Sequence, residues 1–186
     1  MTKFLRPAGA IEAPTDAELL ERVHSGDRDA LGALYDRHSQ SVYGFVRRLT
    51  SREEAEDIVQ TTFIRLSNVA GSFDARGLSA RGWIHGVAYH VYRERRRTLV
   101  RFREIIAEYA EEKLGVQHAR SHEAVDVERA LSRLSEPKRT VLVLTQVHGF
   151  TSEEVARMLD VPLGTVWTRL HHARRDLKAL LEGEAP

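Results

Sequence analysis

The chain has 186 residues, 42% of them hydrophobic, which is enough for one or two small domains with cores of their own. It contains no cysteine, so disulfides, thiolate zinc sites and cysteine nucleophiles are excluded. The longest uninterrupted apolar run is only Val141 to Leu144 and the first residues lack an apolar signal segment, so we expect a cytoplasmic protein without membrane insertion.

The net charge of +1 conceals an uneven distribution of charge along the chain. Residues 81–103 carry seven basic residues against Glu94, and residues 104–128 carry seven acidic residues against Lys113 and Arg120. A basic block, an acidic connector and a basic helix near the C-terminus favour two DNA-facing parts, separated by a segment that DNA repels.

The N-terminal part of the sequence predicts a tail and two helices. Residues 1–14 carry two prolines and no periodicity, which predicts a flexible tail. Thr15 and Glu18 fit a capping box, which predicts a helix from Asp16 to His24 that Gly26 closes. A long helix follows over residues 28–49, with His38 on its apolar face; a histidine there is more often a hydrogen-bonded core residue than a metal ligand.

A third helix is predicted to start at a capping box formed by Ser51 and Glu54 and to end at about Val69. The acidic residues of its first turns have two interpretations. They suit the positive end of the helix dipole, which is the interpretation that the residues alone favour. Alternatively, Glu56, Asp57 and Gln60 form a docking face for a partner.

Residues 70–79, with the sequence AGSFDARGLS, predict a glycine-bearing loop that exposes Phe73 and Arg76. Ser79 should cap a helix over residues 80–103, which tolerates Gly82 and Gly86 although each glycine costs about 1 kcal/mol relative to alanine. Aromatic residues alternate with arginines on its predicted outer face, as in single-strand binding surfaces; a solvated arginine-rich helix end explains them equally well. That outer face consists of Tyr89, His90, Arg93, Arg96 and Arg97.

The connector over residues 104–122 ends near two histidines, His118 and His122, spaced four residues apart. Such a pair could hold a metal on a helix, but the sequence fixes no further ligand near them, so we expect no metal site. Two helices should follow over residues 123–134 and 135–147, the second with Pro137 in its first turn and Gly149 as its stop.

Residues 151–181 predict two helices joined by a tight turn. Thr151 and Glu154 form a capping box, and Asp160-Val161-Pro162 should end the first helix. The second helix has an apolar stripe and an opposite face of small polar and basic residues, as a helix-turn-helix requires for the major groove. An amphipathic helical hairpin with a solvated basic face is the alternative. The polar face carries Thr165, Thr168, Arg169, His172 and Arg175, flanked by Trp167, His171, Arg174 and Lys178.

The sequence resembles a bacterial RNA polymerase sigma factor of the small, extracytoplasmic-function (ECF) type, with only the second and fourth sigma regions. AEDIVQTTFIRL (residues 55–66) resembles the segment that docks on the polymerase beta-prime clamp helices. Residues 83–88, followed by the arginines at 95–97, resemble the segment that melts and reads the minus-ten element. Residues 131–181 are similar throughout to the fourth region, which reads the minus-thirty-five element. Tyr89-His90, Glu94 and Ser135 depart from the family's usual Arg-Asn, aspartate and proline, and these differences bear on promoter preference.

The resemblance implies an all-α fold with two small helical domains. It divides the chain into a tail (1–14), sigma region 2 (15–103), an acidic linker (104–122) and a region 4 helix-turn-helix (123–182). It implies a sigma factor that directs core polymerase to promoters and initiates transcription, with no catalytic activity and no cofactor. The implied partners are core polymerase, through its beta-prime clamp helices and beta flap, promoter DNA and an anti-sigma factor.

Three sets of binding residues follow from the matching motif positions and from the helix faces described above. The polymerase-binding set is Glu56, Asp57, Gln60 and Phe63. The minus-ten set is Phe73, Arg76, Tyr89, His90, Arg93, Arg96 and Arg97. The minus-thirty-five set is Thr165, Thr168, Arg169, His172, Arg174 and Arg175.

Three other functions compete with this one. A two-domain repressor or activator would bind duplex DNA tightly without polymerase, and it gives no role to the loop over residues 71–79. A sigma mimic that sequesters an anti-sigma factor would not need the basic helix at residues 93–97 or an intact recognition helix. A metal enzyme would have to use pairs such as His118/His122 or His171/His172, and the latter two point to different sides of their helix.

Overall fold

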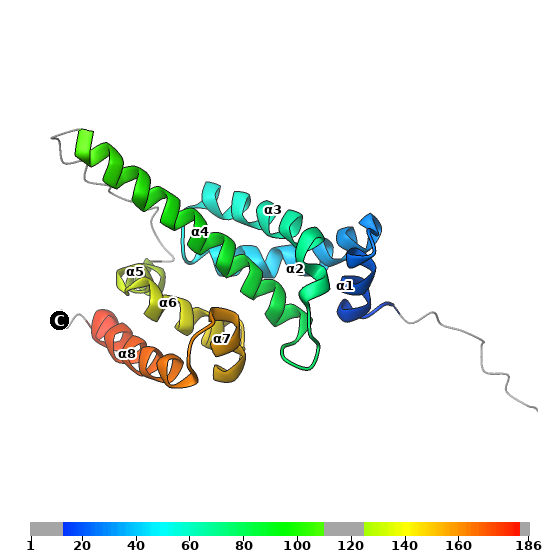
Figure 1. The fold of residues 1–186 in the computed structure, drawn as a ribbon. Coiled ribbons are helices and arrows are strands. Elements are labelled where there is room, and N and C mark those ends of the chain that lie inside the picture. The colour runs from blue at the N-terminus through cyan, green and yellow to red at the C-terminus, as the bar shows by residue number, and fades with distance from the viewer. Residues whose placement is uncertain (1–12, 110–124, 183–186) are drawn as a thin grey trace, which may run out of the picture.

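The computed structural model describes residues 13–109 and 125–182, and within these ranges every regular element is helical (Figure 1). This confirms the prediction of an all-α fold. In chain order the elements are α1 (Asp16–His24), α2 (Arg28–Arg47), α3 (Arg52–Val69), a 3-10 turn (Ala70–Ser72), α4 (Ala80–Tyr109), α5 (Val125–Arg133), α6 (Glu136–Leu142), a π-helical turn (Val143–Val147), α7 (Ser152–Leu159) and α8 (Leu163–Glu182).

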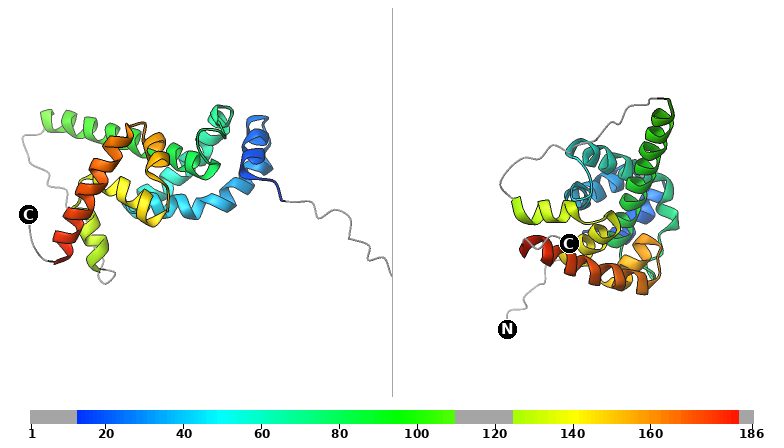
Figure 2. Two further views of the ribbon diagram at one scale, coloured as in Figure 1. Left: turned by 90° about the horizontal axis from the view of Figure 1, so that it is seen from below. Right: turned by 90° about the vertical axis from the view of Figure 1, so that its left-hand side faces the viewer.

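The helices form two groups, an N-terminal unit of α1–α4 and a C-terminal unit of α5–α8 (Figure 1). The two further views show the C-terminal unit lying alongside α4, with α7 packed against that helix (Figure 2). No helix in the described ranges is long and apolar enough to cross a membrane. Residues 1–12 and 110–124 lie outside the described residues, and so do His118, His122 and most of the predicted tail and linker.

Side-chain caps fix where the N-terminal helices begin. The capping box of α1 is complete: the Glu18 amide donates to the Thr15 hydroxyl (3.3 Å), and the Thr15 amide donates to the Glu18 carboxylate (2.7 Å). The box predicted for α3 forms only in part. Ser51 accepts from the Glu54 amide, but the Glu54 carboxylate accepts from the Thr50 hydroxyl instead of the Ser51 amide.

The core of the N-terminal unit is built from one apolar stripe of each helix. His38 is buried in it, with its Nε2 atom 2.7 Å from an Asp16 carboxylate oxygen, so the prediction of a hydrogen-bonded core histidine is confirmed. The large side chains that are fully buried in this unit include Leu19, Leu20, Leu34, Phe45, Ile58, Leu66 and Ile84.

The described part of helix α4 runs to Tyr109, past the expected end at residue 103. Neither glycine nor proline occurs between Arg97 and Tyr109, so nothing in that stretch breaks a helix. Two salt bridges connect α4 to α3. Arg65 donates from both terminal nitrogens to Glu94 (2.8 and 2.6 Å), and Arg95 donates to Asp57 (3.1 Å). Glu94, the one acid of the basic block, therefore anchors the helix.

The C-terminal unit contains the predicted pair of helices. Thr151 and Glu154 form a complete capping box at the start of α7, which ends at Asp160 in the left-handed conformation (φ 52°) that aspartate tolerates. Helix α8 then starts at Leu163. The helix predicted over residues 135–147 is present, as α6 followed directly by the π-helical turn of Val143–Val147. The wider turn lets the His148 amide donate to the Val143 carbonyl (3.1 Å).

Candidate nucleic-acid and polymerase interfaces

Helix α8 has a buried side and an accessible side. Val166, Leu170 and Ala173 are buried in the C-terminal unit, which fixes the rotation of the helix. Of the predicted minus-thirty-five residues, Thr168, Arg174 and Arg175 are exposed, whereas Thr165, Arg169 and His172 are half-buried. The Thr168 hydroxyl donates to the Gly164 carbonyl (2.9 Å), so its methyl group and its remaining acceptor capacity are what it can offer to DNA.

An ion-pair network ties α8 to α6. Asp176 accepts from Lys138 (2.5 Å) and from Arg175 (3.0 Å), and these hydrogen bonds hold the pKa of the Asp176 carboxyl below its usual value. Arg175 is therefore already paired with a residue of its own helix, α8. Arg174 and Arg169 make no ion pair within the described residues and remain available for an anionic ligand.

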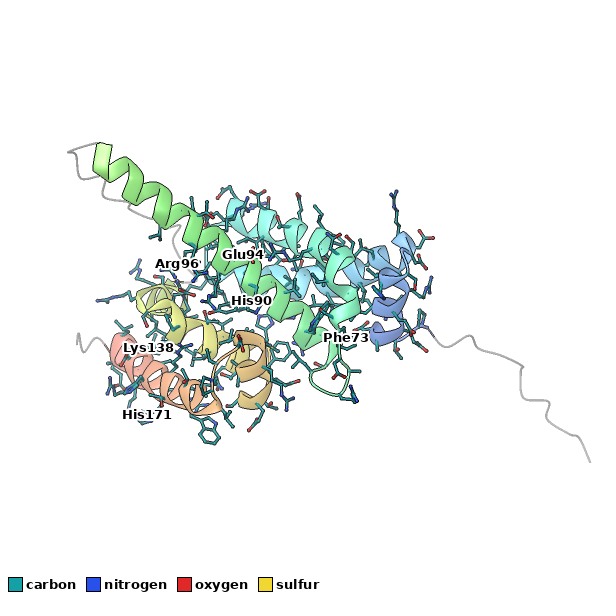
Figure 3. All side chains as sticks on the ribbon, viewed as in Figure 1. Phe73, His90, Glu94, Arg96, Lys138 and His171 are labelled. Atoms are coloured by element: carbon teal, nitrogen blue, oxygen red, sulfur yellow. The ribbon has the colours of Figure 1, made fainter. Side chains whose placement is uncertain are left out.

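Sequence reasoning left Trp167 out of the DNA-reading set, because it lies on the flank of the predicted face. In the structure this side chain is 56% exposed, in the second turn of α8 and next to Thr168. Its signal in the sequence is a large aromatic residue between the predicted DNA-reading residues Thr165 and Thr168. His171 lies one turn further along α8, on the side that faces away from α4 (Figure 3).

The predicted outer face of α4 is only partly accessible. His90 and the three arginines Arg93, Arg96 and Arg97 are exposed, but Tyr89 is 6% exposed, so its expected exposure is wrong. Burial raises the pKa of the Tyr89 phenol. Of the charges in the C-terminal unit, Glu136 also raises this pKa and Arg169 lowers it. The cause is that the C-terminal unit packs over this side of α4, a contact that local sequence does not encode.

The same contact involves two further α4 residues. Tyr92, absent from the predicted set, is 5% exposed, and Arg96 forms an ion pair with Glu136 of α6. Figure 3 shows His90 and Arg96 along the junction between α4 and the C-terminal helices. Arg93, Arg96 and Arg97 line a shallow hollow there together with Glu136.

The loop before α4 packs against neighbouring residues more closely than its composition predicts. Phe73, expected to be exposed, is half-buried, because its ring packs edge-on against Trp83 with centroids 5.6 Å apart. Arg76 is exposed as predicted, and it pairs with Asp74 within the loop (3.0 Å). Two residues of α7 reach the loop: Arg157 donates to the Gly77 carbonyl, and Glu154 accepts from the Ser79 hydroxyl (3.4 Å).

The predicted polymerase-binding residues divide into exposed and buried members. Glu56, Asp57 and Gln60 are exposed along α3, whereas Phe63 is 4% exposed and packs against Tyr35 with ring centroids 4.9 Å apart. Because Phe63 is buried, it can affect this surface only indirectly, by packing beneath it. The prediction omitted Ile64, which is 67% exposed and shares a helix face with Asp57 and Gln60.

An aromatic cluster fills the junction between the two units. His85 of α4 lies 5.3 Å from His148 and 5.1 Å from Phe150, measured between ring centroids, and Phe45 lies 5.9 Å from both histidines. Arg81 donates to the His148 carbonyl (2.8 Å), and its guanidinium lies 4.6 Å from the centre of the Phe150 ring. The junction therefore combines apolar packing with directed polar contacts.

Comparison with known proteins assigns the two units. Residues 34–102 match the family described as Sigma-70 region 2, and residues 124–177 match Sigma-70, region 4. The ECF RNA polymerase sigma factor SigM of Mycobacterium tuberculosis is 34% identical over 90% of this chain and 85% of its own length. The chain belongs to the ECF sigma factors. The ECF RNA polymerase sigma-E factor of Haemophilus influenzae is also similar, with 31% identity over 88% of this chain and 93% of that protein.

Solved structures share the fold of this ECF sigma factor. One is the sigma factor RpoE in complex with the anti-sigma factor NepR from Bartonella quintana, with a TM-score of 0.68 and 24% identity, covering 83% of this chain and 98% of that one. Another is CnrH in complex with the cytosolic domain of CnrY, with a TM-score of 0.66 and 24% identity, covering 91% and 99% of the two chains.

The histidines at the junction of this ECF sigma factor are held neutral. His85 Nδ1 lies 2.8 Å from the Arg81 carbonyl and Nε2 lies 3.2 Å from the Ser41 hydroxyl, a pattern that one neutral tautomer satisfies. Burial lowers the pKa of both His85 and His148 to about 4, and for His148 the nearby Arg48 and Arg81 add to this effect. Within the described residues, no group of three or more potential ligands could hold a metal ion.

Acidification should loosen the junction. An exposed histidine takes up a proton near pH 6.5, whereas these two resist protonation until about pH 4. The packed state should therefore be most stable above pH 6.5 and lose stability as the pH falls from 6.5 toward 4. Urea unfolding at several pH values should show this loss for the native chain and a smaller loss for His148→Phe. Equal pH dependence of the two proteins would contradict it.

Proposed function

We propose that this ECF sigma factor recruits core polymerase through the α3 face and opens and reads promoter DNA with its two units, without catalysing a reaction itself. The α3 face is formed by Asp57, Gln60 and Ile64. The loop before α4 and the accessible arginines of α4 would capture unpaired minus-ten bases, and α8 would read the minus-thirty-five duplex. The observation that supports the proposal is the rotation of α8, whose buried stripe leaves Thr168 and Arg174 exposed and Arg169 half-buried.

We also propose a cytoplasmic protein regulated by an anti-sigma factor. Two solved structures of the same fold are described as complexes with the anti-sigma factor NepR and with the cytosolic domain of CnrY. Binding of this kind suits a protein made of two small units, because a partner that holds both units can remove both DNA-reading surfaces at once. The beta flap of polymerase is the proposed contact for the C-terminal unit.

The test is run-off transcription with core polymerase on a library of promoters, followed by sequencing of the transcript starts. The expected result is initiation from a subset of templates that share two short elements, and only when the sigma factor is present. Tight binding to duplex DNA without polymerase, with unchanged start sites, would favour the repressor or activator alternative.

The exposed Trp167 side chain yields a prediction about a single thymine methyl group of the promoter. An exposed indole beside the base-reading residues suits an apolar contact with a thymine methyl group in the major groove. Replacing one thymine of the minus-thirty-five element by deoxyuridine, which lacks that methyl group, should weaken holoenzyme binding by about fourfold, the value of one buried methylene-sized group. Trp167→Ala should bind both templates equally. A deoxyuridine scan that affects neither protein at any position would contradict the contact.

A further inference from the structure

The three consecutive arginines of α4, Arg95, Arg96 and Arg97, point in different directions. Successive residues of an α-helix lie about 100° apart around its axis. Arg96 and Arg97 line the hollow at the junction with the C-terminal unit, together with Arg93 one turn earlier. Arg95 lies on the side of α3, where its Nη2 atom is 3.1 Å from a carboxylate oxygen of Asp57. The arginines are therefore divided between two surfaces.

We propose that Arg95 is a positioning residue for the polymerase contact. It holds the carboxylate of Asp57 in place on the α3 face, and it does not contact promoter DNA. The inference rests on the proposed binding of core polymerase by that face. It gives Arg95 a role different from that of Arg96 and Arg97, although all three belong to one segment of the sequence that resembles the minus-ten reader.

Arg95 is itself held in place between the two helices. Its side chain is half-buried, and its second terminal nitrogen, Nη1, is buried and has no hydrogen-bond partner within the described residues. The preceding residue, Glu94, accepts from both terminal nitrogens of Arg65 on α3 (2.8 and 2.6 Å). Such a bidentate pair restricts both the distance and the rotation of α4 relative to α3. Arg95 therefore meets Asp57 from a fixed direction.

The Asp57 carboxylate keeps acceptor capacity for a partner. Its side chain is 59% exposed, and only its Oδ2 atom accepts from Arg95. A carboxylate has about four acceptor sites on two oxygens, so Oδ1 can still accept from an amide or a cation of polymerase. An exposed carboxylate without a partner samples several rotamers, and binding would have to order it. Arg95 orders it beforehand and so favours binding.

Titration of labelled sigma factor with core polymerase tests the proposal. Asp57→Ala should weaken binding by at least about fivefold. Arg95→Ala should weaken it about two- to fivefold, the effect of one exposed ion pair. If Arg95 acts through Asp57, Arg95→Ala should have no further effect in the Asp57→Ala background. Arg95→Lys should retain most of the affinity, because only one guanidinium nitrogen donates to Asp57 and an ammonium can replace it.

The matched control is Arg22→Ala. It removes an ion pair of similar exposure from the same unit, between Arg22 of α1 and Asp27 (2.7 Å). This variant should bind core polymerase as the native chain does, because neither residue belongs to the α3 face. A loss equal to that of Arg95→Ala would show a general effect of removing a surface arginine and would count against positioning.

The salt dependence of promoter binding by the assembled holoenzyme distinguishes positioning from DNA contact. Removal of one phosphate contact lowers the slope of log affinity against log salt concentration by about one. Arg97→Ala, which removes a proposed DNA contact, should show this change. Arg95→Ala should keep the native slope once its holoenzyme is assembled with saturating sigma factor. A lower slope for Arg95→Ala would place this side chain on DNA and overturn the inference.

The polymerase titration separates the inference from the proposed function. Native affinity of Arg95→Ala, with weak binding by Asp57→Ala, would refute the positioning role alone. Tighter binding by Arg95→Ala would show that the ion pair competes with polymerase, and additive losses in the double variant would show that Arg95 acts independently of Asp57; both contradict positioning. If Asp57→Ala and Ile64→Glu both bind as the native chain does, the proposed α3 contact fails and the inference falls with it.

Discussion

Replacement of Arg169 by alanine is expected to reduce transcription from a cognate promoter by about 5- to 150-fold, because one good base contact contributes roughly 1–3 kcal/mol of discrimination. Arg169 is half-buried on α8, makes no ion pair within the described residues and follows the exposed Thr168. The loss should concern promoter recognition alone. Run-off transcription measures the effect, and co-purification with core polymerase should be unchanged.

The matched control for this substitution is Arg133→Ala, which removes an exposed arginine from the end of α5 in the same unit. It should transcribe as the native chain does. Native promoter output from Arg169→Ala would refute the assigned DNA-reading face. An equal loss of polymerase binding and transcription would instead place Arg169 in the polymerase contact.

The substitution Ile64→Glu is expected to weaken binding to core polymerase by about 30-fold or more, which corresponds to the loss of one interface hot spot of roughly 2 kcal/mol. Ile64 is 67% exposed on the α3 face beside Asp57 and Gln60, so a carboxylate there would have to be desolvated in the complex. The free protein should unfold at the same urea concentration as the native chain, because the side chain contributes little to the core.

Titration of labelled sigma factor with core polymerase provides the measurement for Ile64→Glu. Ile64→Val keeps an apolar side chain at the same place and should retain most of the affinity. Native affinity of Ile64→Glu would move the polymerase contact away from α3. A lower unfolding midpoint would show that the substitution acts on the fold instead of the interface.

Local sequence signals predicted most of the helices. Complete capping boxes at Thr15 and Thr151 mark the starts of α1 and α7 where they were expected, since a cap depends only on residues three positions apart. The helix-turn-helix followed from periodicity and a stop before Leu163. The end of α4 was placed too early, at residue 103, although no glycine or proline interrupts the helix before Tyr109.

The candidate sites were less predictable, because exposure depends on packing between segments distant in sequence. Phe63 matches a family motif yet lies in the core, and the neighbouring Ile64 carries the exposed apolar surface. Tyr89 was placed on an outer face that the C-terminal unit covers. Gly82 and Gly86 were recognised as unusual in a helix, and both lie beside Met158 of α7, a neighbour that local sequence does not predict.

Permanganate footprinting of promoter DNA tests the central claim most directly, because permanganate oxidises thymines that have left the duplex. The claim is that this ECF sigma factor lets core polymerase find a start site and separate the strands there. Thymines of the minus-ten element should become reactive only when core polymerase and the sigma factor are both present. Equal reactivity with core polymerase alone, or none with the complete mixture on any promoter of the library, would contradict it.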